Sequence, residues 1–295
     1  MLTRNLFLVF ALFSSFLLPA QGLLDLLEEE AASEGPEAEY VSTAFFSTRV
    51  INGQSVENPY PGDLIFIISH HFGSLNQGSY ELFGIDNATI RMGFEYGVND
   101  RLALSLGRST WEKNFDGFFK YKLLRQQTGL REVPVTVSWF SGVYIKSERW
   151  AQPDRGYDFH HRMSYVHQVL VARKFSPGFS LQLTPAWVHK NLVPGADDPN
   201  DLFVLGAGGR MQLTPWVSFN AEYFYRFNPP QSFNTWNSFS IGFDFDTGGH
   251  VFQLHFTNSQ PMFERAFLTE TRGNWIDGDI YFGFNITRVF GLRKP

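Results

Sequence analysis

The feature that most constrains the fold is a repeated alternation of apolar and polar residues between about residue 62 and residue 290. Ile90, Met92 and Phe94 fall on one face of their segment, whereas Arg91 and Glu95 fall on the other. Successive side chains of a strand point to opposite sides, so each such segment is predicted to be a strand with one apolar and one polar face. Segments of about 10 to 15 residues exceed the usual strands of soluble sandwiches, which have about 5 to 6. The pattern is typical of a transmembrane β-barrel.

The alternation predicts twelve strands, an even number, as single-chain bacterial barrels require. The expected ranges are 62–72, 87–97, 101–109, 112–124, 133–143, 160–174, 178–190, 201–213, 216–227, 236–246, 249–258 and 278–290. Most of the even-numbered connections are short turns with Asn-Asp, Ser-Pro or Thr-Pro, and most of the odd-numbered ones are long. We therefore expect an all-β, antiparallel up-and-down barrel over residues 62–290, with short periplasmic turns and longer outer loops.

The N-terminus has the pattern of a secretory signal peptide. Arg4 precedes an apolar run over residues 6–18, and Pro19-Ala20 provide small residues before a cleavage expected near Ala20. An N-terminal membrane anchor is the alternative, but the apolar run is short. A signal peptide followed by a barrel predicts export to the bacterial outer membrane. The expected partners are then outer-membrane lipid and the barrel assembly machinery.

Two segments separate the signal from the barrel. Residues 21–39 are rich in glutamate and predict a mobile, acidic periplasmic lead-in. Residues 40–61 are too polar for a lipid-facing strand and carry Arg49, Asn52 and Glu57. They lie either in the lumen as a plug or in the periplasm as an extra strand, because unpaired backbone cannot lie in lipid. We favour the plug.

Composition excludes several classes of protein. Without cysteine there are no disulfides and no thiolate metal sites. The net charge of −5 comes from the acidic lead-in, and the barrel itself is close to neutral. No basic run or basic patch suggests nucleic-acid binding. Residues 291–295 form a short C-terminal tail beyond the last predicted strand.

A family resemblance is carried by the residues around the first predicted strand. Residues 47–57 (STRVINGQSVE) are followed by residues 66–73 (FIISHHFG), and residues 96–102 (YGVNDRL) match more weakly. These stretches resemble the start of an uncharacterised family of bacterial outer-membrane β-barrel proteins, filed as a domain of unknown function. The resemblance implies the barrel and its location. It implies no activity, cofactor or site residue.

The polar faces of the predicted strands define the expected lumen. Its candidate lining residues are Arg91, Glu95, Lys120, Lys122, Arg210, Glu222, Arg226, Asp244, Asp246 and His255. Such a mixed set either lines a selective channel or forms a salt-bridge network that closes the lumen. We expect a non-enzymatic barrel that acts as a narrow channel or uptake pore for small polar solutes. The alternative is a plugged docking barrel whose outer loops 144–159 and 259–277 bind partners.

Metal and cofactor sites are not expected. The histidine pairs at 70–71 and 160–161 lie in predicted strands, where neighbours point to opposite faces, so each pair offers one ligand at most to a single site. The acidic loop at residues 197–201 could bind a cation weakly, but a solvated loop is the simpler interpretation.

A barrel hydrolase is the third hypothesis and has the least support. His255, Asn258 and Ser259 supply the residue types that a serine hydrolase needs. However, Ser259 lies in a predicted loop, and the sequence contains no Gly-x-Ser-x-Gly nucleophile elbow.

Overall fold

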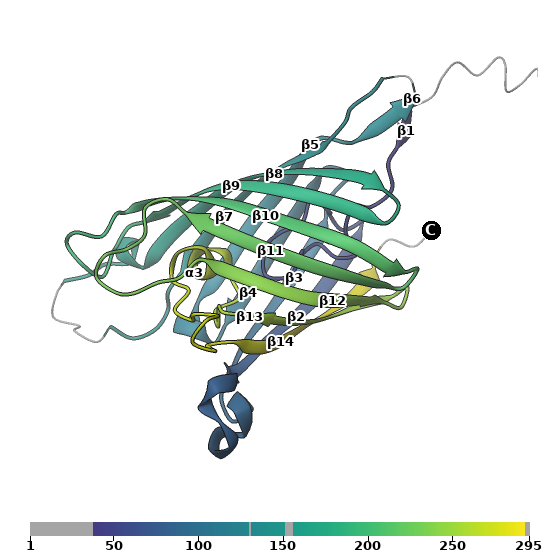
Figure 1. The fold of residues 1–295 in the computed structure, drawn as a ribbon. Coiled ribbons are helices and arrows are strands. Elements are labelled where there is room, and N and C mark those ends of the chain that lie inside the picture. Colours follow the sequence, from purple (N-terminus) through teal and green to yellow (C-terminus); the bar gives the residue numbers. More distant parts are fainter. Residues whose placement is uncertain (1–37, 130, 151–155, 293–295) are drawn as a thin grey trace, which may run out of the picture. The chain divides into compact units, whose positions relative to one another are not determined.

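The computed structural model describes residues 38–129, 131–150 and 156–292. Within them, twelve antiparallel strands form a closed barrel in which β14 pairs with β2 (Figure 1). The barrel strands are β2 (Asp63–Ser74), β3 (Ala88–Gly97), β4 (Leu102–Ser109), β5 (Phe115–Leu124), β7 (Thr136–Ile145), β8 (Met163–Ser176), β9 (Phe179–Lys190), β10 (Asp201–Thr214), β11 (Val217–Arg226), β12 (Ser238–Asp246), β13 (His250–Thr257) and β14 (Tyr281–Gly291). The prediction of an antiparallel, up-and-down, twelve-stranded barrel is confirmed. Among the described residues, no helix has the length and apolar character needed to cross a membrane.

The strand boundaries agree with the alternation to within three residues. Four strands (β5, β7, β8 and β14) begin three residues later than predicted, and in two of them a short 3-10 helix replaces the predicted start. β5 begins at Phe115 rather than 112, because Trp111–Lys113 form a 3-10 turn in which Glu112 and Lys113 have positive φ. β8 begins at Met163 rather than 160, because His160–Arg162 form another 3-10 turn. Alternation does not reveal such turns.

A second, smaller unit was not anticipated. β1 (Ala38–Tyr40) pairs antiparallel with β6 (Gln127–Gly129), which lies in the connection between β5 and β7. Residues 38–39 were predicted to belong to the mobile lead-in, and residues 125–132 fell in the gap between the predicted strands 112–124 and 133–143. Three-residue strands are too short for alternation to identify. The predicted signal peptide and the rest of the acidic lead-in lie outside the described residues.

The two faces of the barrel wall differ as the alternation predicts. On β3, Met92 and Phe94 expose 49% and 50% of their surface on the outside, whereas Arg91 and Glu95 each expose 1%. The neighbouring strands repeat this pattern, with apolar residues outside and polar residues inside. The core of the molecule is therefore the filled interior of the barrel.

The outer face provides a direct test of the barrel as a membrane protein. Replacing Phe94 by Arg places a charge on an outward position in the middle of β3, and we expect it to cost about 2–4 kcal/mol if that position lies near the bilayer midplane. Heat-modifiable gel mobility should show loss of the folded barrel. Phe94→Leu, which keeps an apolar outer face, is the matched control and should fold normally. Equal folding of both variants would contradict a lipid-facing wall.

Candidate functional site

The inner segment, residues 44–58, lies inside the barrel and is almost continuously buried (Figure 1). It forms a tight reversal in which the Val50 amide donates to the Gly53 carbonyl at 2.8 Å. Arg49 and Gln54 pair across this reversal as an antiparallel bridge. The segment spans part of the range in which a plug was expected, and its contacts are with inner-face residues of several strands.

The tip of the inner segment is held by Glu222 on β11. The Glu222 carboxylate accepts hydrogen bonds from the backbone amides of Asn52 at 2.8 Å, Gly53 at 3.1 Å and Ile51 at 3.2 Å. Gly53 permits this approach, since a Cβ there would lie 2.7 Å from the Phe224 ring. One carboxylate thus satisfies three buried backbone donors that would otherwise lack partners.

The same tip reaches three further strands. Asn52 Nδ2 donates to the Ser240 hydroxyl at 3.1 Å and to the Thr257 hydroxyl at 3.3 Å, on β12 and β13. Asn285 on β14 donates to the Ile51 carbonyl at 3.0 Å. The candidate residue Asn52 is therefore an anchor that joins the segment to the β11–β14 side of the wall.

Two further strands, β5 and β9, hold the returning half of the segment. Lys120 Nζ on β5 donates to the Ser55 carbonyl at 3.0 Å. Gln182 on β9 accepts from the Val56 amide at 2.9 Å and donates to the Gln54 carbonyl at 2.7 Å. The inner segment is thus bonded to the wall across the full width of the lumen.

The connection between β13 and β14 also folds into the barrel. Residues 258–273, here called the inward loop, are largely buried and contain the short helix α3 (Glu264–Thr269), which lies within the barrel in Figure 1. This corrects the expectation that 259–277 is an outer docking loop, because Phe263 and Phe267 are both fully buried. Burying these rings inside is more favourable than leaving them in water.

The inner segment and the inward loop form two layers of apolar contacts inside the barrel. The inner segment belongs to a cluster of Ala44, Phe45, Val50, Val56, Leu170 and Ala172. The inward loop belongs to a second cluster that includes Phe263, Ala266, Phe267, Leu268, Tyr144, Val166, Val188 and Leu202. On β8, Leu170 and Ala172 are closer to the short turn and Val166 is closer to the long loops. The two layers therefore follow one another along the barrel axis.

Glu264 of α3 connects the two layers. One carboxylate oxygen accepts from Gln54 Nε2 at 2.7 Å and from Arg49 Nη1 at 3.0 Å, and the other accepts from the Tyr144 hydroxyl at 2.6 Å. Arg49 also lies 3.6 Å from the Glu95 carboxylate. Arg49 and Glu95 were both candidates, whereas Glu264 and Tyr144 were missed.

Two other candidate cations are held by groups inside the barrel. Arg91 forms a two-point ion pair with Asp116, with Nη2 at 2.5 Å from the carboxylate. Arg226 donates to the Thr269 carbonyl at 2.5 Å and to the Trp236 carbonyl at 2.9 Å. Arg226 thereby holds the end of α3 against the wall.

The remaining buried candidates face the inner segment. Arg210 stacks over the Phe46 ring, with 4.6 Å between its guanidinium carbon and the ring centroid. Asp244 accepts from Gln253 Nε2 at 2.9 Å, and the same nitrogen lies 3.2 Å from the Val50 carbonyl. Both side chains therefore contact other residues of the barrel interior.

Two candidates lie toward the barrel end and are only partly buried. Lys122 lies 4.0 Å from Glu57, whose carboxylate also accepts from the Ala44 amide at 2.7 Å. Asp246 accepts from the Gly248 amide at 2.8 Å and so caps the turn between β12 and β13. Asp246 is thus a turn residue in this state.

His255 faces the interior and meets His71 from β2, across the intervening strand β14. The two Nε2 atoms lie 2.8 Å apart, and His71 Nδ1 lies 2.9 Å from the Gln260 carbonyl of the inward loop. Since a carbonyl only accepts, neutral His71 carries its proton on Nδ1 and accepts at Nε2 from His255. Gly283 makes the contact possible, because a Cβ there would lie 2.7 Å from His255 Nε2 and closer still to the His71 ring.

Gly283→Ala should therefore displace the histidine pair. We expect about 1–3 kcal/mol of destabilisation, as for other overpacked interiors, seen as a lower melting temperature of the folded barrel on gels. Gly291→Ala on the same strand is the matched control, because its nearest atom is Asp63 Oδ1 at 3.7 Å. Equal melting temperatures for both variants would show that the pair is not tightly packed.

The structure does not bring together the residues that the sequence suggested for a metal site or a hydrolase site. Among the described residues, no group of three or more His, Cys, Asp or Glu side chains could hold a metal. His161 lies in a 3-10 turn and pairs with Asp158 at 2.7 Å, so the two-face argument for 160–161 was wrong. The buried Ser259 hydroxyl donates to the Pro261 carbonyl at 3.3 Å, whereas His255 pairs with His71. The suggested hydrolase residues form no catalytic arrangement.

The acidic loop before β10 is structural. Burial raises the pKa of Asp198, but hydrogen bonds from Ser232, from the Gln231 amide at 2.7 Å and from the Gly195 amide at 3.0 Å lower it to about 2. Asp201 accepts from the Trp187 indole at 2.8 Å. Asp198 is therefore a buried link between two loops, whereas the rest of residues 191–200 is exposed or half-buried, as expected of a solvated loop.

One comparison with known protein families agrees with this architecture. A family model described as "Membrane bound beta barrel domain" matches residues 45–290. Among solved structures, the NanC porin is 10% identical, with a TM-score of 0.49 over 77% of this chain and 98% of that chain. An outer membrane channel from Pseudomonas putida F1 is 12% identical, with a TM-score of 0.47 over 79% and 97%. Acinetobacter baumannii Omp33 is 10% identical, with a TM-score of 0.40 over 79% and 100%. No curated protein matches the chain.

Proposed function

The chain belongs to the family of membrane-bound β-barrel domains, and on that premise we propose that it is a gated outer-membrane channel for small polar solutes. The inner segment and the inward loop hold the lumen shut, and displacement of both opens it. Export through the N-terminal signal, contact with outer-membrane lipid and folding by the barrel assembly machinery are parts of the same proposal.

The observation that carries the proposal is the chemistry of the wall beneath the two segments. Glu222, Lys120, Gln182 and Asn285 bind the inner segment through hydrogen bonds to its backbone. Water can replace hydrogen bonds of this kind, whereas an apolar interior would lose its stabilisation when wetted. Displacement of the segments would leave a lumen lined mainly by polar and charged groups, with one apolar belt that includes Tyr144, Val166 and Val188 at the level of α3. Twelve strands also enclose more space than the side-chain-filled interior of an eight-stranded barrel.

Glu264 provides the test of gating, because it binds both the inner segment and the wall. Glu264→Gln removes the nearer of the two carboxylate charges that face buried Arg49, and breaking a buried pair costs up to about 3–5 kcal/mol. A loss of only 1.4 kcal/mol of the free energy that favours the closed state raises the ratio of open to closed barrels about tenfold. We therefore expect the purified variant to show at least about tenfold higher open probability than the wild type in planar bilayers.

The matched control for this test is Asp158→Asn, which removes an exposed carboxylate from a loop ion pair with His161. It should leave the conductance unchanged. A folded Glu264→Gln barrel that remains electrically silent would overturn the gating proposal. Equal opening in both variants would show that the effect is not specific to the link between the layers.

A docking barrel is the second candidate, and one observation favours it. The connection between β2 and β3 presents Tyr80, Leu82, Phe83 and Ile85 with 90%, 55%, 56% and 59% of their surfaces exposed. Substituting all four by Ser should abolish partner capture if this tip is the docking surface. The channel proposal predicts that the conductance of the same variant is unchanged.

A further inference from the structure

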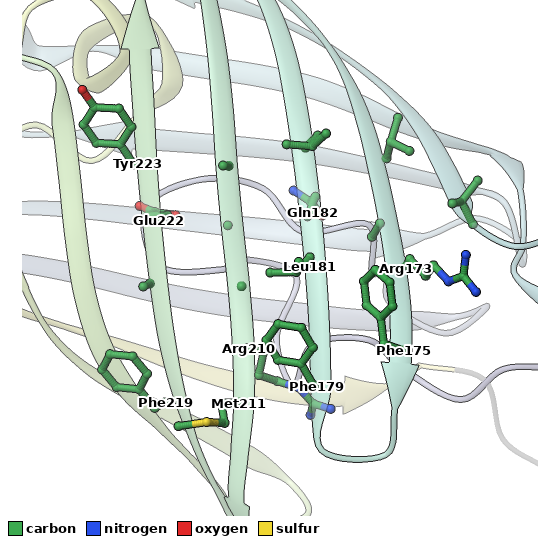
Figure 2. A pocket seen from close by; sticks show the side chains of 18 of the residues that line it. Arg173, Phe175, Phe179, Leu181, Gln182, Arg210, Met211, Phe219, Glu222 and Tyr223 are labelled. Carbon is green, nitrogen blue, oxygen red and sulfur yellow. The ribbon is translucent and has the colours of Figure 1, made fainter.

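The outer face of the barrel carries a hollow of about 700 Å³ over β8 to β12 (Figure 2). This volume lies within the range of sites that hold small molecules, about 300–1,000 Å³. Phe175, Phe179, Met211 and Phe219 lie toward the short-turn end in Figure 2, and Tyr223 lies toward the other end. The hollow therefore opens to the medium around the barrel, which for a membrane-bound barrel is lipid.

The floor of the hollow consists of small outward-facing residues on adjacent strands. Gly209 on β10 is directly opposite Ala221 on β11, and Ala207 lies two residues before Gly209 on the same face. Leu181 and Leu183 on β9 pair with Gly209 and Ala207 and form one side wall. The missing side chains of the floor thus create a groove between larger apolar neighbours.

The glycines of β10 are not all required for the same reason. A Cβ on inward-facing Gly206 would lie 2.5 Å from the Phe224 ring, and one on inward-facing Gly208 would lie 3.3 Å from Val50. Interior packing therefore accounts for both. Gly209 faces outward, where the nearest side-chain atom is the flexible end of Leu181 at 3.0 Å. A glycine inside a strand often marks the close approach of a ligand, and here that approach comes from the lipid side.

One flank of the groove carries a cation. Arg173 on β8 is directly opposite Leu181, faces outward and lines the hollow. Its guanidinium carbon lies 5.1 Å from the centroid of the Phe175 ring. Within the described residues, no carboxylate forms an ion pair with it. Arg173 lies close to the turn that joins β8 and β9, at the end of the barrel where lipid headgroups are expected.

We propose that this groove is a binding site for an anionic phospholipid. One acyl chain lies along the floor over Gly209, Ala207 and Ala221, between the leucines of β9 and the aromatic residues of β11. The phosphate is bound by the guanidinium of Arg173. The pairing of an apolar groove with the outward-facing cation of Arg173 favours this occupant over a second copy of the chain, which would not need the cation.

The experiment measures lipid retention by native mass spectrometry of the purified barrel, titrated with phosphatidylglycerol or phosphatidylethanolamine. The wild type should bind phosphatidylglycerol more tightly. Arg173→Gln should lose about fivefold of this preference, the equivalent of one interfacial cation. Gly209→Leu and Ala221→Leu should each weaken binding of both lipids by about tenfold, because the new side chain displaces roughly two methylene groups of the acyl chain.

Close matches for these substitutions exist outside the groove. Gly117→Leu also adds a leucine to an outward glycine, with Leu106 at 3.2 Å in place of Leu181. Arg108, stacked over Phe115 at 4.9 Å, is the counterpart of Arg173. Gly117→Leu and Arg108→Gln should retain wild-type binding. Equal losses in the control and groove variants, or equal binding of both lipids by the wild type, would overturn the proposal. If Gly209→Leu instead changes the oligomeric mass, the occupant is a second copy.

Discussion

A barrel that lacks both the inner segment and α3 is expected to conduct continuously, whereas a barrel that lacks only one of them stays nearly closed. The two layers follow one another along the axis, so their resistances add in series and the intact layer limits the current. Deleting residues 44–58 removes the first layer. Replacing residues 260–271 by a short Gly-Ser link removes the second. The link is feasible because Asn258 Nδ2 already bonds the Gly273 carbonyl at 2.9 Å.

The measurement is single-channel conductance of the wild type, the two single variants and the double variant in planar bilayers. We expect the conductance of the double variant to exceed that of each single variant by an order of magnitude or so. The reason is that twelve strands enclose more space than side chains of the wall alone can fill. Refolded mobility on gels controls for assembly of each variant. If the deletion of 44–58 alone opens the barrel fully, the inward loop does not restrict the lumen and the series arrangement is wrong.

The second large effect is expected from Glu222→Ala. It leaves the amides of Ile51, Asn52 and Gly53 without their acceptor, and each buried donor without a partner costs about 1–3 kcal/mol. The tip of the inner segment should therefore detach from β11. The strand pairing should keep the barrel wall itself folded. We expect a large fall in the midpoint of urea-induced release of the segment, detected by protease cleavage within residues 44–58.

Glu222→Gln is the matched variant for this test. Its single carbonyl oxygen still accepts hydrogen bonds, so it should lose markedly less stability than Glu222→Ala. The chain contains no cysteine, which permits a second measurement: a single cysteine at Asn52 should become reactive to a polar maleimide when Glu222 is alanine. Unchanged protection in that variant would show that the three amides do not depend on this carboxylate.

Alternation predicted much of this molecule because a barrel wall imposes a local rule. Whether a residue faces lipid or lumen depends only on its position within the strand, so Arg91, Glu95 and Lys120 could be placed on the inner face without knowledge of any partner. The partners themselves lie far away in sequence. Arg49 and Glu264, for example, are 215 residues apart. No local pattern specifies such a pair.

The inward loop shows where the local rule fails and which signal was available. Phe263, Phe267 and Leu268 form an apolar cluster inside a connection that had been interpreted as an outer, partner-binding loop. Spacing of this kind predicts a short amphipathic helix, and an outer loop has no apolar surface of its own on which to bury it. The contact between His71 and His255 carried no such signal, because it spans a third strand and requires Gly283 to lie between the rings.

The pairing of β14 with β2 has a consequence for the order of folding. Closure joins strands at the two ends of the barrel sequence, so it involves the largest sequence separation of any strand pair and is a slow, late contact. The inner segment directly precedes β2 and is bonded to β11, β12, β13 and β14. It is therefore enclosed as the first strand meets the last. We expect these contacts to bring the C-terminal strands toward β2 during assembly, so removal of the segment should slow closure of the barrel even where the finished barrel is stable.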